Sequence, residues 1–292
     1  MKPDFYRQPA ALSDPSSQVA LFDDLPGDAG ALSRIVQGLV IHQHIASSYG
    51  IALSQEKHAE VHTRSVEDML KNIAARDSAP LADARAPGDR QVGVCRHFTL
   101  MHVAMLRRKG VAARARCGFA AYFEKGRYLD HWVTEYWDLA RERWLLVDAQ
   151  LDRHQQKLFG IAFDPLDVPR QLFVVAGEAW RRCRDGKADP RQFGILDMYG
   201  LWFVAGNVIR DIAALNNHEM LPWDVWGAMP RGDSDVDLEL FDRLAVLSGE
   251  PDRHFEGLGE AYRDSRVAVP PTVFNAVLGR PQEIAEISAA MA

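Results

Sequence analysis

The stretch 93–110, GVCRHFTLMHVAMLRRKG, decides the fold of the central part of this chain. From Phe98 onward, apolar residues recur every three or four positions, which predicts an amphipathic helix. Gly110 follows a basic last turn and predicts the C-terminal end of this helix. Gly93 precedes it, so Cys95 is expected in or beside the first turn. There, unpaired N–H groups and the helix dipole can lower a cysteine pKa from ~8.5 into the range ~3.5 to 7.5. The stretch therefore predicts a helix that begins at a reactive thiol.

Downstream of this helix the pattern changes to that of strands. ARARCGFAAYF at 113–123 predicts one strand, and HWVTEYWD at 131–138 with RWLLVDAQ at 143–150 predicts an antiparallel hairpin. Helices are predicted upstream for 29–49 and 65–76, with a loop at 77–89 between the second of them and the Cys95 helix. Helix-like segments return after residue 165.

This order of elements predicts the α+β fold class, in which the helix that carries Cys95 packs on a small antiparallel sheet and further helices precede and follow. Three regions are expected: an irregular N-terminal lead-in at 1–28, a core with its N-terminal helices at 29–164, and a mostly helical region at 165–292 packed on that core.

A nucleophilic thiol needs a base within hydrogen-bond reach, and helix geometry separates the nearby histidines. His97 lies about 200° around the helix axis from Cys95, and His102 lies roughly 10 Å along it, so neither reaches the sulfur of a regular helix. His131 lies on a later strand and is able to face the start of the helix. It is therefore the candidate base.

Asp148 is the candidate for the group that orients His131. If the hairpin turn is centred on Leu139 and Ala140, Asp148 lies opposite His131, and a shift of one or two positions leaves the two adjacent or diagonal. Asp148 ends an apolar strand, where an unpartnered buried carboxylate would be costly. A histidine N–H is a suitable partner.

GVCRHF, RRKGVAARARCGF, DHWVTEYWD and RWLLVDAQ together resemble the core of the transglutaminase-like superfamily. The resemblance covers about residues 90–152. His131 follows Cys95 by 36 residues, and Asp148 follows His131 by 17, which fits this family. It implies a papain-like arrangement with Cys95 as nucleophile, His131 as general base and acid, and Asp148 as the residue that orients the imidazole. Gln91 is the candidate side chain for the oxyanion.

Two other residues are weaker candidates for substrate contacts. Arg96 could bind a substrate carboxylate, although arginines are common on helix surfaces. Trp132 could line an apolar groove, although core packing is the simpler explanation.

The expected chemistry is acyl transfer through an acyl-thioester, giving amide or peptide hydrolysis or transamidation, without a cofactor or a metal. The expected partners are a small-molecule or peptide-like acyl substrate and, for transamidation, an amine acceptor. Two alternatives stay open. One is a transglutaminase-like scaffold that binds without catalysis, and the other is a metallohydrolase built on His58 and His62, which have i, i+4 spacing.

Composition narrows the classes of function. The chain has 292 residues, 47% hydrophobic and 25% charged, with a formal net charge of −6, and its basic residues are scattered. This balance argues against an extended nucleic-acid-binding face. No apolar run is long enough to span a bilayer, and the first residues lack a signal-peptide pattern. The three cysteines form no evident disulfide framework, so we expect a cytoplasmic protein.

Overall fold

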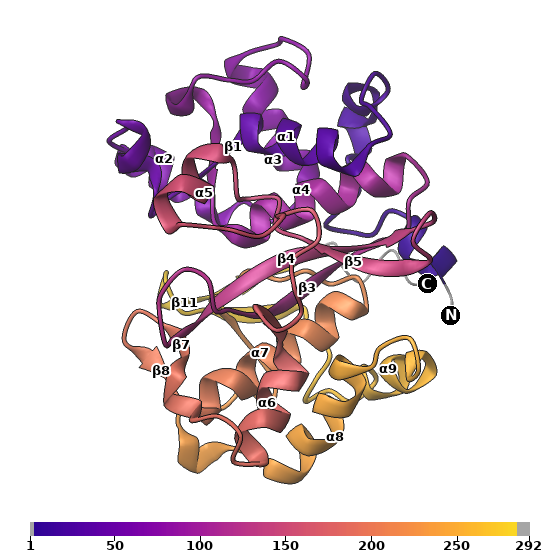
Figure 1. The fold of residues 1–292 in the computed structure, drawn as a ribbon, viewed down its shortest axis with the longest axis vertical. Coiled ribbons are helices and arrows are strands. Elements are labelled where there is room, and N and C mark those ends of the chain that lie inside the picture. The colour runs from indigo at the N-terminus through magenta and orange to yellow at the C-terminus, as the bar shows by residue number, and fades with distance from the viewer. Residues whose placement is uncertain (1–2, 285–292) are drawn as a thin grey trace. The chain divides into compact units, whose positions relative to one another are not determined.

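The computed structural model describes residues 3–284 (Figure 1). These residues form two compact units. The Cys95 unit comprises 3–114 and 133–168, and the His131 unit comprises 115–132 and 169–284. The division falls inside β3 (Ala113–Ala120) and inside β4 (Tyr128–Asp138), so each of these strands contributes residues to both units. Both units contain helices and strands, which confirms the α+β class.

The longest helix of the Cys95 unit is α4, which runs from Cys95 to Arg108. Helices α1 (Ala29–Leu39) and α3 (Val66–Arg76) both contact α4 (Figure 1). Each begins at a side-chain cap, because Asp28 accepts a hydrogen bond from the N–H of Ala31 and Ser65 accepts one from that of Asp68. The remaining helices of the unit are α2 (Gln55–Ala59), α5 (Arg153–Phe159) and the 3-10 helices η1 (Pro3–Arg7), η2 (Ser16–Phe22), η3 (Ala46–Tyr49), η4 (Glu60–His62) and η5 (Pro87–Asp89).

The predicted helix at 29–49 is wrong beyond Leu39. The chain becomes extended at Val40, and β1 (Val40–His42) pairs in parallel with β2 (Gln91–Gly93). Apolar periodicity continues through this segment, but pairing with a strand some fifty residues away overrides it. The predicted helix at 65–76 and the C-terminal end of α4 near Gly110, whose φ is +74°, are confirmed.

The main sheet has the strand order β6-β3-β4-β7-β8, with β5 (Arg143–Val147) paired antiparallel to β4. The three remaining strands are β6 (Phe173–Val175), β7 (Phe193–Ile195) and β8 (Met198–Tyr199). Strand β7 runs parallel to β4, so the sheet is mixed rather than wholly antiparallel as predicted. The predicted strand at 113–123 and the 131–150 hairpin are confirmed with changed bounds, because β3 ends at Ala120, β4 begins earlier, at Tyr128, and β5 ends at Val147.

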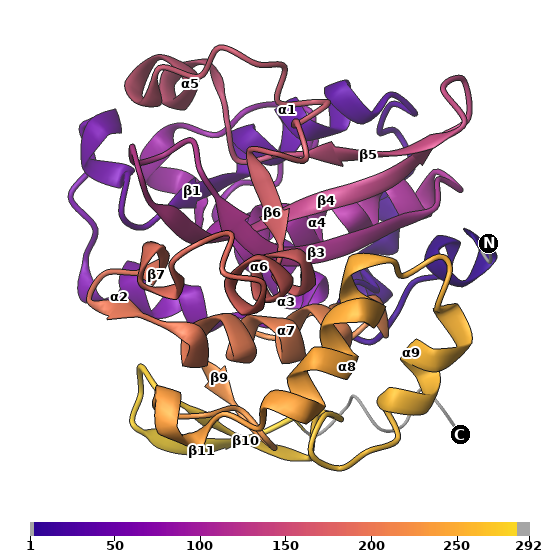
Figure 2. The same ribbon diagram turned by 60° about the horizontal axis from the view of Figure 1, so that its bottom comes forward.

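In the His131 unit, α6 (Ala176–Arg184), α7 (Leu201–Leu215) and α8 (Leu238–Gly249) pack against one another, and α9 (Phe255–Ala261) contacts α8 (Figure 2). A separate three-stranded sheet of order β11-β10-β9 was not predicted. Its strands are β9 (Asp224–Val225), β10 (Thr272–Asn275) and β11 (Arg280–Glu283), and the 3-10 helices of the unit are η6 (Pro190–Gln192) and η7 (Asp233–Asp235).

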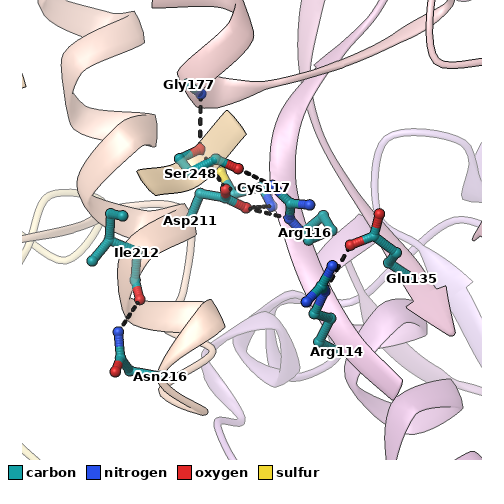
Figure 3. Close-up of polar contacts among 9 residues, drawn as sticks. All are labelled: Arg114, Arg116, Cys117, Glu135, Gly177, Asp211, Ile212, Asn216 and Ser248. Carbon is teal, nitrogen blue, oxygen red and sulfur yellow. Dashed lines mark hydrogen bonds and ion pairs between the residues drawn. The ribbon is translucent and has the colours of Figure 1, made fainter. Parts of the chain in front are cut away.

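A buried ion pair connects β3 to the helices of the His131 unit (Figure 3). Nη2 of Arg116 lies 2.9 Å from Oδ2 of Asp211 on α7, and the backbone N–H of Cys117 donates to Oδ1 of Asp211 at 2.8 Å. The hydroxyl of Ser248 on α8 donates to Asp211 at 2.7 Å and accepts from the N–H of Gly177 on α6 at 2.9 Å. One carboxylate therefore fixes a strand and two helices, and through Ser248 a third.

None of the helices within residues 3–284 is both long enough and apolar enough to cross a membrane.

Candidate active site

Cys95 is the first residue of α4, as predicted. Strand β2 ends at Gly93, and Val94 is extended with φ −124° and ψ 177°, which turns the chain from strand into helix. The Cys95 side chain is 6% exposed. The sulfur is therefore near the N–H groups and the positive dipole end of a 14-residue helix.

His97 is used to cap this helix. Its Nδ1 accepts a hydrogen bond from the N–H of Val94 at 3.1 Å, and its Nε2 lies 3.0 Å from the carbonyl oxygen of Thr63, so Nε2 carries the proton and donates. Complete burial lowers the pKa of His97 to about 3, and the charge of Arg96 acts in the same direction. His97 is therefore a neutral structural residue.

His102 is also held by neighbours inside the Cys95 unit. Its Nε2 lies 3.0 Å from the carbonyl oxygen of Ala29 on α1, and its Nδ1 lies 3.1 Å from the hydroxyl oxygen of Thr134 on β4. Burial lowers the pKa of His102 to about 4. Both α4 histidines thus have partners other than Cys95, in agreement with the helical geometry.

Gln91 and Arg96 flank Cys95 in the sequence, and both are fully buried. The side-chain amide of Gln91 donates to the carbonyl oxygens of Glu60 at 3.3 Å and Val92 at 3.0 Å, and accepts from Asn72 at 3.1 Å. Both of its N–H groups are thereby engaged, so its contacts give no support to an oxyanion role. The burial of Arg96 likewise gives no support to a role in binding a substrate carboxylate.

Asp148 directly follows β5 and is 1% exposed. Its Oδ1 accepts a hydrogen bond from the N–H of Gln150 at 3.1 Å, and its own N–H donates to the carbonyl of Pro165 at 2.9 Å. The carboxylate is thus a buried group in the same unit as Cys95.

The register of the hairpin differs from the predicted one by two positions. Thr134 pairs with Val147 and Asp138 with Arg143, so the loop spans 139–142 and is not centred on Leu139 and Ala140. The ladder ends at Val147, before Asp148, so the turn on which the predicted opposition of His131 and Asp148 depends is not the one that forms.

His131 lies on β4 in an aromatic environment. Its ring centroid is 4.9 Å from that of Phe123, 6.0 Å from that of Tyr122 and 6.3 Å from that of Phe173, with all three arrangements near edge-to-face. The imidazole is 3% exposed, and the adjacent Trp132 is 1% exposed. Trp132 therefore contributes to the core of the His131 unit, which is the simpler of its two explanations.

A series of hydrogen-bonded polar side chains that starts at Asp130, the residue before His131, was not predicted from the sequence. Nδ2 of Asn207 donates to Oδ1 of Asp130 at 2.8 Å, and Nη1 of Arg210 donates to Oδ1 of Asn207 at 3.0 Å. Burial raises the pKa of Asp130, and Arg210, Asn207 and His131 oppose this rise. Asp130 precedes His131 in the sequence, but its partners come from α7, about eighty residues later, so no local pattern could identify them.

Arg114 and Arg116, both on β3, form structural contacts. Nε of Arg114 lies 2.7 Å from Oε2 of Glu135 (Figure 3). The guanidinium carbon of Arg114 lies 4.0 Å from the ring centroid of Trp144. Arg116 forms the ion pair with Asp211 described above. Both arginines are about 1% exposed, which favours structural roles.

The metallohydrolase alternative gains no support. His58 lies on α2 and His62 on η4, so the two do not share one α-helix. Within residues 3–284, no three or more His, Cys, Asp or Glu side chains are grouped so that they could hold a metal ion.

Comparison with known proteins gives one family and one solved structure. Residues 33–149 match the family model of the Transglutaminase-like superfamily. A search of curated proteins gave no match. A crystal structure from Cytophaga hutchinsonii, provisionally described as a cysteine protease, is 18% identical, with a TM-score of 0.35. The match covers 58% of this chain and 44% of that one.

The matched segment contains Cys95, His131 and Asp148, and it extends upstream through β2 and α3 into α1. It begins well before the resembling stretch 90–152. At a coarse level it supports a papain-like cysteine enzyme. The resemblance is thus confirmed: residues 33–149 of this chain match the transglutaminase-like superfamily.

Proposed function

We propose that this protein is a cysteine-dependent acyl-transfer enzyme in which Cys95 is the nucleophile, His131 the general base and acid, and Asp148 the residue that orients His131. The observation that carries the proposal is the location of Cys95 as the first residue of α4 within the superfamily segment. The two histidines of α4 itself have other partners, which leaves His131 as the base that the family pattern requires.

In the first half-reaction the Cys95 thiolate attacks the carbonyl carbon of an amide, peptide or thioester, forming a C–S bond. The negative charge that develops on the carbonyl oxygen is stabilised by backbone N–H groups of the first turn of α4. The bond to the leaving group then breaks, and His131 donates a proton to that group. The product is an acyl-thioester on Cys95.

In the second half-reaction a nucleophile attacks this thioester. His131 removes a proton from the nucleophile, the C–S bond breaks, and the thiolate is restored. Water as nucleophile gives hydrolysis, whereas an amine gives transamidation. We propose a small or peptide-like acyl substrate. Because the nucleophile must be reduced, a reducing compartment such as the cytoplasm fits the proposal.

The test is alkylation of Cys95 by iodoacetamide between pH 5 and 9, followed by intact mass. An activated thiolate gives rapid single labelling at pH 6, lost in Cys95→Ala and slowed at least tenfold in His131→Ala. Cys183 supplies an internal comparison, because burial and the nearby Asp189 raise the pKa of its thiol to about 12. It should label slowly throughout this range.

Acyl transfer itself is tested by incubating the protein with thioester and amide acyl donors and searching for a covalent adduct by mass. An adduct that is absent in Cys95→Ala supports the proposal. Labelling that rises only above pH 8 and is unaffected by His131→Ala, together with no adduct, would instead identify a binding scaffold.

A further inference from the structure

The loop that joins β3 to β4, residues 121–127, presents two adjacent aromatic side chains to His131. Tyr122 and Phe123 both contact the imidazole edge-to-face, and their own ring centroids lie 4.7 Å apart. Neighbouring residues of a strand point to opposite faces. The irregular backbone of this loop allows both rings to reach one imidazole.

These rings are more exposed than the neighbouring aromatic pair Phe119 and Phe193 of the His131 unit. Phe119 and Phe193 pack edge-to-face at 5.2 Å, and both are completely buried. Tyr122 and Phe123 are only partly buried. Partial exposure of two rings beside one imidazole is typical of the lining of a binding site.

The loop is held at both ends. The N–H of Ala121 donates to the carbonyl of Leu172 at 2.8 Å. At the other end, Nη1 of Arg127 donates to the carbonyl of Arg191 at 2.8 Å, and its guanidinium lies 4.6 Å from the ring centroid of Tyr199. Only the tip, residues 124–126, is exposed. The two rings are therefore preorganised, which lowers the entropic cost of binding.

We infer that Tyr122 and Phe123 form a subsite for the group that leaves or enters at the acyl carbon, and that this group carries an aromatic or large apolar substituent. The inference rests on the role proposed above for His131. Because His131 exchanges protons with the leaving group and with the attacking nucleophile, rings in contact with its imidazole lie beside those groups and not beside the acyl chain. Edge-to-face contact favours an aromatic substituent.

The experiment compares two thioesters that differ only in the leaving thiol, S-(2-phenylethyl) thioacetate and S-ethyl thioacetate. Both leaving groups are alkyl thiols, and both reactions form the same acetyl-Cys95, so the ratio of the two second-order rate constants reports contacts made by the leaving group. We expect the phenylethyl thioester to react about tenfold faster. In Phe123→Ala and Tyr122→Ala this ratio should fall about fivefold, whereas Tyr122→Phe keeps the ring and should retain it.

Phe274→Ala is the matched control, because Phe274 is a 43% exposed aromatic residue of the same unit, on β10. It should leave both rate constants unchanged. Equal rates for the two thioesters, or a ratio unaffected by both alanine substitutions, would overturn the inference while leaving acetyl-Cys95 formation intact. If neither thioester acetylates Cys95 in the unaltered protein, the proposed function fails and the subsite fails with it.

Discussion

The backbone N–H of Val94 donates to Nδ1 of His97 across 3.1 Å, and this bond closes the turn that contains Cys95. The proton on Nε2 of the same ring is donated to Thr63. The two ring nitrogens of His97 thus hold the start of α4 in place, one by accepting a hydrogen bond and the other by donating one. Only a neutral ring can make this pair of bonds, because an imidazolium has no acceptor.

The burial of a neutral His97 predicts sensitivity to acid. In the unfolded chain the group titrates near 6.5, but in the folded protein its pKa is about 3. Between these values the unfolded state binds the extra proton, so the free energy of unfolding decreases as the pH falls through this window. His97→Gln keeps an acceptor for the N–H of Val94 and removes the titration. The free energy of unfolding is measured with urea at pH 7.5 and at pH 5. It should change less between these two pH values in His97→Gln than in the unaltered protein. An equal change would contradict a neutral, buried His97.

Gly93→Ala should destabilise the protein by about 1–3 kcal/mol through overpacking. A Cβ atom at Gly93 would lie 2.7 Å from Cβ and 2.8 Å from Cγ of His97, and neither is the end of a flexible chain. The matched control is Gly88→Ala, whose Cβ would have no neighbour closer than 3.8 Å. Urea unfolding of both variants checks this, and equal stability losses would refute it. The displaced His97 should also slow labelling of Cys95 by iodoacetamide in Gly93→Ala alone.

The ion pair of Arg116 and Asp211 predicts that a single substitution greatly lowers the free energy of unfolding. Asp211→Ala leaves Arg116 buried without its carboxylate and should lower the free energy of unfolding by about 3–5 kcal/mol. Ser248→Ala removes two hydrogen bonds but no charge and should cost about 1–3 kcal/mol. The double variant Arg116→Met/Asp211→Leu leaves no unpaired charge, so its free energy of unfolding should fall by less than that of Asp211→Ala. Denaturant titrations rank the three, and a harmless Asp211→Ala would show that the pair is not a structural connection.

The buried Asp130 predicts that stability depends on pH in the opposite direction to the dependence that His97 causes. Its folded-state pKa is raised by burial, so the folded state holds the proton longer than the unfolded state does, and stability falls as the pH rises above about 4. Asp130→Asn retains an acceptor for Asn207 and cannot ionise. Its stability relative to the unaltered protein should therefore increase between pH 4 and pH 7. Thermal unfolding across this range measures the difference, and a constant difference would be evidence against the buried carboxyl.

Two strong local patterns made much of the candidate site predictable. The helical period after Phe98 and the glycines at 93 and 110 bound α4, and the Trp- and Val-rich runs identify the hairpin strands. The register of the hairpin was harder to predict from the sequence. The loop spans 139–142, with Glu142 at a φ of +49°, instead of being centred on Leu139 and Ala140, and propensity alone does not distinguish such loops.

The sequence by itself determined the α+β class, the helix that starts at Cys95 and the resemblance of residues 90–152 to the transglutaminase-like superfamily, because these depend on spacing between residues that are near one another in the chain. Only the tertiary structure decided that α1 ends at Leu39, that β7 joins the sheet in parallel, and that Tyr122 and Phe123 both contact His131. Each of these depends on a pairing or contact partner outside the local pattern. Local propensity is too weak to specify such partners, and burial of the joint apolar surface selects them.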